Sequence, residues 1–286
     1  MNIYDIITAK IIEKLKEGTI PWKKCWLSDI PQNFVTKQPY RGVNKLLTSI
    51  TPYKNNNWIT FIQAKKLGLN IKKGEKGTAV IYFRNRQTTL EDQSTDSGKQ
   101  SFSSINNRPF CATHHIFNLD QTDYIEPQEK KHDKKPQITD RCEAIITKWK
   151  DRPEIRNIGN EAFYSYAGDY IQLPKKNAFY SIEEYYSTLF HEAIHSTGHP
   201  SRLNRKIPER NKQKINDNYS EEELIAEIGA SFLCDHAGII NSVIDNQTAY
   251  IKNWLKALSN DKTLILKASS LAQQAADYIL SKDSYG

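Results

Sequence analysis

The residues whose types and spacing suggest chemistry are two histidines and a glutamate in the segment His191-Glu-Ala-Ile-His195. Four residues span about one turn of an α-helix, so His191 and His195 project from one helix face. Two imidazoles arranged in this way can hold one divalent metal. Glu192 can act as general base toward a water at the open position of that metal. The spacing therefore predicts His191 and His195 as metal ligands and Glu192 as the catalytic residue.

The segment around this motif has the signals of a buried helix over about residues 182–197. Ser181 and Glu184 have the spacing of a capping box, and Tyr180 and Tyr185 are placed as a hydrophobic staple. Apolar residues then recur at helical spacing, namely Tyr185, Tyr186, Leu189, Phe190, Ala193 and Ile194. Two histidines and a glutamate are costly on such a helix without a partner. A metal is therefore favoured over two hydrogen-bonded core histidines.

A catalytic zinc takes about three protein ligands, so a third must come from another element. A histidine three residues after Gly198 would suit, but residue 201 is Ser. His199 falls too early for that spacing, and we expect it in a loop or beside a ligand. The site therefore needs a carboxylate from farther along the chain.

The predicted helix over residues 220–236 offers two candidates, Glu223 and Glu227, which are four residues apart on one face. The preferred arrangement has Glu223 as the third ligand and Glu227 as acceptor for a ligating histidine. The alternative has Ser220 and Glu223 forming a capping box, which leaves Glu227 as the ligand. The cofactor expected is one divalent metal. This ligand set favours zinc, with manganese as the alternative.

Composition and charge limit the class of protein. The 286 residues are 38% hydrophobic, and no apolar run approaches the ~20 residues that span a bilayer. The first residues lack a signal-peptide pattern. The four cysteines, Cys25, Cys111, Cys142 and Cys234, have no C-x-x-C spacing, which indicates reduced thiols. We therefore expect a cytoplasmic protein with no membrane partner.

The chain divides into a basic and a nearly neutral part. Residues 1–135 hold 22 Lys and Arg against 13 Asp and Glu, whereas the remainder holds 18 against 20. A charged, Pro-bounded stretch at 127–137 reads as a linker between domains at 1–126 and 138–286. Residues 85–108 are polar and predict a flexible excursion. The basic part suggests a polyanion as partner.

Hydrophobic periodicity predicts the remaining elements of an α+β protein. We expect helices over residues 2–17, 60–67, 140–150, 245–258 and 263–281. Strands at 78–83 and 110–118 should pair, and residues 162–166 and 170–174 should form a hairpin. The strand at 170–173 is a candidate edge to which an extended substrate could add.

The basic part also interleaves aromatic residues with cations. Flat rings can stack unpaired bases, and lysines and arginines can follow phosphates, so single-stranded DNA is the expected partner. A core role for any single aromatic residue is the alternative. The candidate DNA-binding residues are Trp22, Lys23, Lys24, Trp26, Tyr40, Arg41, Asn44, Lys45, Trp58, Lys72, Lys73 and Lys76.

Several motifs in a fixed order resemble the ArdC antirestriction family of mobile elements, whose relatives include the N-terminal region of plasmid primases. In the first half these are Tyr-Arg-Gly-Val-Asn at 40–44, Trp-Ile-Thr-Phe-Ile-Gln-Ala at 58–64, Lys-Gly-Glu-Lys-Gly at 73–77 and Phe-Asn-Leu-Asp-Gln-Thr at 117–122. In the second half they are the motif at 191–199, Ser-Arg-Leu-Asn-Arg at 201–205 and Glu-Glu-Leu-Ile-Ala-Glu-Ile-Gly-Ala at 222–230.

This resemblance implies a basic α+β domain that binds single-stranded DNA, followed by a zincin-like metallopeptidase domain similar to the Spartan protease. It implies metal ligation by His191 and His195, catalysis by Glu192, and protection of incoming mobile-element DNA from restriction. A DNA-bound or restriction-related protein would be the substrate. Two alternatives stay open. One is a non-proteolytic DNA-binding protein with a structural metal, and the other is a general metallopeptidase.

Overall fold

The structure, a computed structural model, describes residues 3–18, 20–22, 30–84, 110–125, 137–205, 217–239 and 247–281. Lys23, Lys24 and Trp26, the predicted excursion at 85–108 and nearly all of the predicted linker lie outside these ranges. None of the described helices is long and apolar enough to cross a membrane.

The first half combines three helices with a four-stranded sheet. In chain order its elements are α1 (Ile3–Lys16), β1 (Gln32–Asn33), α2 (Gly42–Ser49), β2 (Asn57–Thr60), α3 (Phe61–Lys66), β3 (Thr78–Arg84), β4 (Phe110–Asn118) and the 3-10 turn η1 (Leu119–Gln121). The strand order is β1-β2-β4-β3. β3 pairs antiparallel with β4, which confirms the predicted pairing across residues 85–109.

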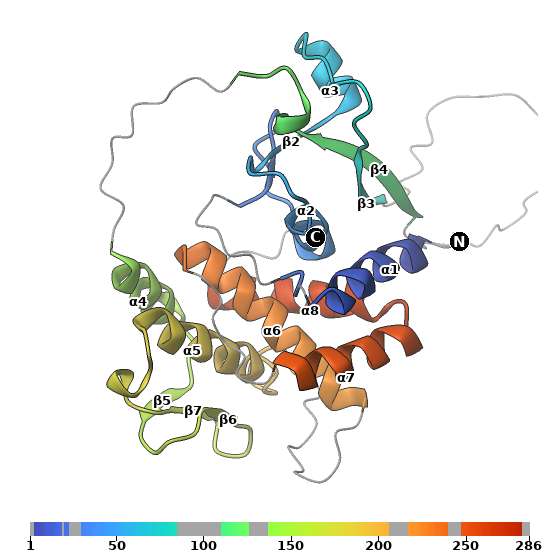
Figure 1. The fold of residues 1–286 in the computed structure, drawn as a ribbon. Coiled ribbons are helices and arrows are strands. Elements are labelled where there is room, and N and C mark those ends of the chain that lie inside the picture. Colours follow the sequence, from blue (N-terminus) through green and yellow to red (C-terminus); the bar gives the residue numbers. More distant parts are fainter. Residues whose placement is uncertain are drawn as a thin grey trace, which may run out of the picture.

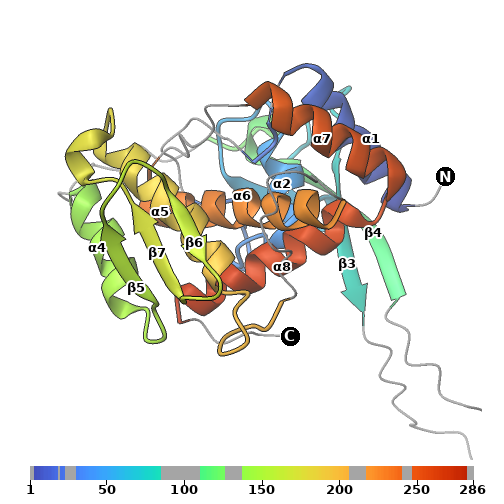
Figure 2. The same cartoon turned by 90° about the horizontal axis from the view of Figure 1, so that it is seen from below.

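The second half places a small sheet against a group of helices. Its elements are α4 (Ile138–Lys148), β5 (Glu154–Asn157), β6 (Phe163–Ser165), β7 (Tyr170–Leu173), the 3-10 turn η2 (Lys176–Ala178), α5 (Ile182–Ser196), α6 (Asp217–Ala237), α7 (Gln247–Asn260) and α8 (Leu264–Ile279). Figure 2 shows the three strands lying beside α4 and α5. The predicted hairpin of β6 and β7 is confirmed.

The strand order β5-β7-β6 corrects one expectation about substrate binding. β7 pairs in parallel with β5 on one side and antiparallel with β6 on the other. Its backbone groups are therefore already used, and the strand at 170–173 offers no free edge. Of the two outer strands, the one that contacts α5, the helix with His191 and His195, is β6.

The two halves share one hydrophobic core. Ile7 and Ile11 of α1 and Leu46 of α2 are at most 1% exposed and belong to the same cluster as the buried residues of α5–α8. In Figure 1, α1 and α2 lie beside α7 and α8. Arg41 at the start of α2 also forms an ion pair with the buried Asp277 of α8. The first two helices are therefore part of the same body as α5.

Candidate metal centre

Helix α5 begins as the sequence predicts, with one correction. The Ser181 hydroxyl accepts a hydrogen bond from the Glu184 amide at 3.1 Å, the first half of the predicted capping box. The Glu184 carboxylate accepts from the Tyr180 amide at 2.9 Å. The predicted staple of Tyr180 on Tyr185 is wrong because Tyr180 is fully exposed. Phe179 takes that place, with its ring edge-on to the ring of Tyr185 and the two centroids 5.4 Å apart.

Helices α5 and α6 approach closely at a glycine. A Cβ atom built on Gly229 would lie 2.8–3.0 Å from three side-chain atoms of Ile194, which is itself fully buried. Real Cβ atoms do not come that close to a neighbour. Gly229 therefore sets the separation of the two helices that carry the candidate ligands.

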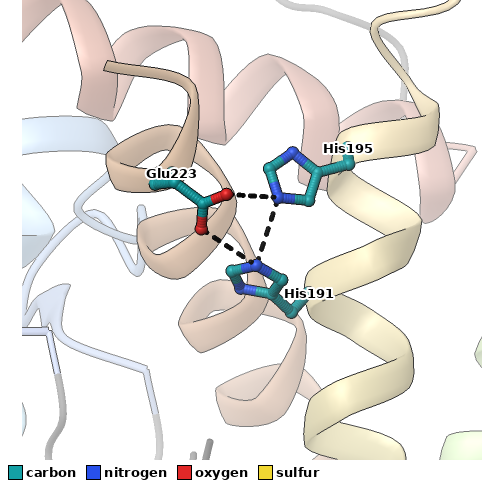
Figure 3. A group of neighbouring side chains, drawn as sticks. All are labelled: His191, His195 and Glu223. Carbon is teal, nitrogen blue, oxygen red and sulfur yellow. Dashed lines mark hydrogen bonds and ion pairs between the residues drawn. The ribbon is translucent and has the colours of Figure 1, made fainter. Parts of the chain in front are cut away.

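Three side chains converge across this helix pair, as Figure 3 shows. The Nε2 atoms of His191 and His195 lie 3.1 Å apart. The carboxylate of Glu223 places Oε2 3.5 Å from Nε2 of His191 and Oε1 3.6 Å from Nε2 of His195. One ligand atom from each residue falls within 4.8 Å of the others. The geometry brings together the two predicted histidines and the preferred glutamate.

The other ring nitrogen of each histidine faces a second glutamate of α6. Nδ1 of His191 lies 3.4 Å from Oε1 of Glu227, and Nδ1 of His195 lies 3.3 Å from Oε1 of Glu222. Carboxylates in such positions orient ligating histidines and raise their basicity. Glu227 has the supporting place that the preferred arrangement gives it. The sequence does not predict this role for Glu222. Its only signal there is that it directly precedes Glu223 on the same helix.

The start of α6 decides between the two readings of Glu223. The helix begins at Asp217, so Ser220 lies within its first turn and is not the residue that caps it. The predicted alternative, in which a capping box occupies Glu223, is therefore wrong. The carboxylate of Glu223 faces the two histidines instead.

Burial and charge make this cluster suited to a cation. His191, Glu192, Glu223 and Glu227 are each at most 8% exposed. Burial alone would lower the pKa of His191, but the carboxylates of Glu223 and Glu227 outweigh it and raise that pKa well above its ordinary value. Nδ1 of His191 and Oε2 of Glu227 are buried without a hydrogen-bond partner among the described residues. Two imidazoles amid buried carboxylates are a donor set that a divalent ion would satisfy.

Two arginines of the Ser-Arg-Leu-Asn-Arg motif hold the end of α5. Arg205 donates to the Ile194 carbonyl at 2.9 Å, to the Thr197 hydroxyl at 2.7 Å and to Oε1 of Glu222 at 2.9 Å. Burial would raise the pKa of Glu222, but His195 and Arg205 outweigh it and lower that pKa. Arg205 thus keeps Glu222 charged and turned toward His195.

Arg202 makes a second set of contacts, to the sheet. It donates to the Ser196 carbonyl at 2.7 Å and pairs with Asp169 in the turn between β6 and β7. The Tyr164 hydroxyl donates to the same Asp169 at 2.8 Å. Arg202 therefore fixes the outer strand β6 relative to the end of α5.

His199 lies outside the cluster, as expected for a loop residue. Its Nδ1 is 2.7 Å from the Ser201 hydroxyl, and its ring packs near Tyr166, with centroids 5.5 Å apart.

The structure corrects several of the predicted DNA contacts. Trp22 is 3% exposed, and its ring packs edge-on against Trp254 with centroids 5.1 Å apart. Trp58 is 1% exposed in a small cluster with Val80 and Ile116. Neither ring is accessible to a base, so both predictions are wrong. Each aromatic residue fills a core instead.

Two residues of α2 are likewise used inside the fold. The Lys45 ammonium is buried, lies 2.9 Å from Asp235 of α6 and sits 4.4 Å from the centre of the Phe232 ring. The Asn44 amide exchanges hydrogen bonds of 2.7 and 2.8 Å with the backbone of Ile81. The buried Lys45 is therefore not accessible to DNA, which corrects that prediction. The half-buried Asn44 joins α2 to β3, and its DNA role stays a prediction.

The remaining candidates differ in exposure. Tyr40 is half-buried against the Trp58 cluster, and the guanidinium of Arg41 is paired with Asp277. Lys72, Lys73 and Lys76 are exposed. These three remain predictions, as do Lys23, Lys24 and Trp26 outside the described ranges.

Comparisons with known proteins cover both halves. Residues 1–117 match the model of the N-terminal domain of anti-restriction factor ArdC, and residues 140–271 match that of a zincin-like metallopeptidase. The DNA primase TraC of Escherichia coli is 33% identical over 97% of this chain, which spans only 27% of the primase. The uncharacterized protein y4eC of Sinorhizobium fredii is 27% identical over 99% of this chain and 93% of its own length.

Two crystal structures of the antirestriction protein ArdC from the R388 plasmid also resemble the whole chain. The metal-free form is 34% identical with a TM-score of 0.75 and covers 98% of this chain and 97% of its own. The Mn(II)-bound form is 32% identical with a TM-score of 0.76 and covers both chains fully (100% each). By its two domain models and its likeness to these structures over their full length, this chain belongs to the ArdC antirestriction protein family.

Proposed function

We propose that this chain is a metal-dependent peptidase that works together with single-stranded DNA to protect incoming DNA from restriction. The observation that carries the proposal is the convergence of His191, His195 and Glu223 beside Glu192 on two packed helices. A zincin-like domain and the manganese-bound R388 relative support a divalent ion at this place. The substrate would be a protein bound to DNA or involved in restriction.

The proposed roles follow from the positions of the side chains. His191, His195 and Glu223 would hold the metal, and both zinc and manganese accept such donors. When bound, the ion supplies Lewis acidity toward a peptide carbonyl and acidifies water. Glu192, 7% exposed and one residue after His191, would take the proton of the attacking water. Glu222 and Glu227 would keep the imidazoles oriented.

The outer strand β6 is the proposed place for an extended substrate. Its partner β7 occupies one edge, and the other edge pairs with no described strand. A peptide added there would run along α5, which contacts β6. The Tyr164 hydroxyl is held by Asp169, whereas Tyr166 just beyond β6 is 40% exposed. Tyr166 is therefore a better donor to a reacting carbonyl than Tyr164.

Metal content tests the first part of the proposal. Inductively coupled plasma mass spectrometry should find about one divalent ion per chain in the wild type. His191→Ala and Glu223→Ala should lose it. Glu192→Gln is the matched control and should keep it, because Glu192 is not a proposed ligand. Absence of metal from the wild type after incubation with zinc or manganese would remove the catalytic proposal.

Activity separates the peptidase from a DNA-binding protein with a structural metal. Glu192→Gln should keep its metal and its DNA affinity but lose cleavage of labelled casein and protection in a transformation assay with a restricting host. The loss of a general base is worth about a hundredfold or more in rate. Full protection by Glu192→Gln would favour the alternative in which DNA coverage alone blocks restriction.

DNA binding needs its own measurement. Fluorescence anisotropy with a labelled single-stranded oligonucleotide should give an affinity that falls steeply with salt, since binding releases counterions. A general metallopeptidase whose basic half binds acidic proteins would show no such binding.

A further inference from the structure

An exposed apolar surface lies on α3, at the end of the molecule remote from the three-stranded sheet (Figure 1). Phe61 and Ile62 are 61% and 67% exposed, and Leu67 just after the helix is 51% exposed. The buried residue of this short helix is Ala64, which packs in a small cluster with Ile59 and Leu119. The large apolar side chains therefore face solvent, while a small residue holds the helix to the sheet. Such a distribution is typical of a binding surface.

Lysines accompany these apolar side chains at helical spacing. Lys65 follows Phe61 by four residues, and Lys66 follows Ile62 by four, so each cation shares a helix face with an apolar side chain. Both lysines are exposed, and neither has an ion-pair partner in the part of the chain that the structure describes. On this surface the Phe61 ring and the Ile62 side chain therefore each lie on one helix face with a lysine ammonium group.

A neighbouring turn extends this surface. The amide groups of Asn33 and Gln63 exchange hydrogen bonds of 3.1 and 3.3 Å, which attach the turn after β1 to α3. That turn carries Val35, 46% exposed, and Lys37, whose ammonium lies 4.4 Å from the centre of the Phe34 ring. We call Val35, Lys37, Phe61, Ile62, Lys65 and Lys66 the α3 surface.

The segment of chain that carries this surface has no acidic residue. From residue 30 to 74 there are eight Lys and Arg and no Asp or Glu. Lys45 is buried against Asp235, and the exposed Arg41 is paired with the buried Asp277. The other six cations are exposed. Asp120 and Asp123, which pack beside this stretch, already accept hydrogen bonds from the amides of Lys54, Asn55 and Asn70. The local field is therefore positive and suits a polyanion.

We propose that the α3 surface is where single-stranded nucleic acid binds, with Phe61 stacking on a base and Lys65 and Lys66 contacting phosphates. The proposal rests on the single-stranded DNA function above and assigns it to residues other than the buried Trp22 and Trp58. Single strands offer free base faces to apolar side chains, whereas duplex bases are already stacked. An acidic protein matches the charge, but only a single strand repeats a flat base beside every phosphate, as the neighbouring Phe61, Lys65 and Lys66 require.

Anisotropy titrations of the full-length chain with a fluorescein-labelled oligothymidylate, over a series of salt concentrations, test this assignment. Phe61→Ala should weaken binding about fivefold to a hundredfold, the range for loss of one base–aromatic stack. Lys65→Gln combined with Lys66→Gln should weaken binding and reduce the slope of log affinity against log salt by about 1.4, two contacts at ~0.7 each.

Matched controls come from the other half. Tyr180→Ala removes a fully exposed aromatic residue, and Lys148→Gln with Lys150→Gln removes two exposed cations. Both controls should bind like the wild type. Metal content should be unchanged in every variant, which shows that each is folded.

Results that differ from these expectations would overturn either the α3 assignment, the DNA function or the choice of a single strand. Wild-type affinity of the Phe61 and Lys65/Lys66 variants, with an intact salt dependence, would overturn the α3 assignment and leave the DNA function standing. No binding by the wild type would overturn both. Equal affinity of the wild type for a duplex of the same length, or displacement of the oligonucleotide by polyglutamate, would overturn the choice of a single strand.

Discussion

His191 and His195 each present one nitrogen to the shared cluster and the other to a glutamate of α6. Glu227 supports His191, and Glu222 supports His195. The two glutamates differ in their own contacts. Glu222 is held by an ion pair with Arg205, whereas Oε2 of Glu227 has no hydrogen-bond partner among the described residues. The pair of Glu222 and Arg205 therefore has a testable role in positioning His195.

Glu222→Gln and Arg205→Gln should each lower metal affinity by about 10- to 100-fold, the usual effect of losing a group that orients a ligand. The first removes the charge facing Nδ1 of His195, and the second frees Glu222 from the end of α5. Competition with a chromophoric chelator measures both affinities.

Glu221→Gln is the matched control for this experiment. It removes a carboxylate from the adjacent position of the same helix, where Glu221 pairs with Lys267 at 2.6 Å. Metal affinity should be unchanged. If Glu222→Gln also binds metal like the wild type, Glu222 has no part in holding His195.

The contacts of Asp169 lead us to expect that the protein loses stability at acid pH. The hydrogen bond from Arg202 outweighs the opposing effect of burial and lowers the pKa of Asp169 from its ordinary 3.8. Because the folded pKa is the lower one, the stabilisation is full above the unfolded pKa and is lost as pH falls through the folded value. Asp169→Asn should cost about 1 kcal/mol at neutral pH, since the carboxylate is partly exposed.

Urea unfolding at several pH values checks this expectation. The difference in free energy of unfolding between wild type and Asp169→Asn should stay constant above about pH 5 and shrink below about pH 4. Asparagine tolerates the positive φ of 47° at this position, so the backbone need not change. Glu161→Gln, an exposed carboxylate outside this network, should show no such trend.

At the scale of elements, the crossing of α5 and α6 determines whether the ligands meet. Gly229→Ala would place a methyl group 2.8–3.0 Å from Ile194, within a fully packed core. Overpacking of this kind costs about 1–3 kcal/mol, which exceeds the ~1 kcal/mol that alanine gains over glycine in a helix. We expect lower stability and weaker metal binding, measured by thermal unfolding and chelator competition.

A second substitution shows whether contact with Ile194 is the cause. Ile194→Val removes the Cδ1 atom nearest to the new methyl group and alone costs about 1 kcal/mol. The double variant should be more stable than the sum of the single effects indicates. Strict additivity would mean that Gly229 acts through something other than this contact.

The long elements were predictable because each carries a periodic pattern. The helices at 182–197 and 220–236 and the hairpin of β6 and β7 have sufficient length or turn signals. By contrast, α2, β1, β2 and β5 were not predicted. β1 has two residues, β2 and β5 have four each, and α2 is eight residues long without a side-chain cap. Their positions depend on packing and pairing that a local pattern does not contain.

The same limit applies to the site. His191, Glu192, His195 and Glu223 were accessible from spacing along two helices. Glu222 could not be distinguished from its neighbours, because its role depends on Arg205 approaching from a separate loop. Trp22 and Trp58 were misassigned because an aromatic residue near lysines has the same pattern whether it faces solvent or a core.

For the molecule as a whole, the shared core predicts one cooperative unfolding transition. Leu46 of α2 is 1% exposed and belongs to the same cluster as the buried residues of α5–α8. Leu46→Ala should therefore destabilise the whole chain by about 2–5 kcal/mol and lower metal retention on heating. Leu67→Ala, at a 51% exposed position, is the control and should have little effect on stability.

Two probes test cooperativity directly. Tryptophan fluorescence and far-ultraviolet circular dichroism should follow the same curve in denaturant. Two separate transitions, with Leu46→Ala shifting one of them alone, would show that the halves unfold independently.

The outer strand β6 has a consequence for aggregation. A strand with one unpaired edge can pair with a strand of another copy as readily as with a substrate, and intermolecular sheet growth can follow. β6 is only three residues long, which restricts the number of backbone hydrogen bonds that a second copy could form. A longer β6 would hold the proposed substrate more firmly but would also expose more edge to self-association. For the peptide substrate that we propose, the short strand would limit the affinity available from backbone pairing and leave selection to the surrounding side chains.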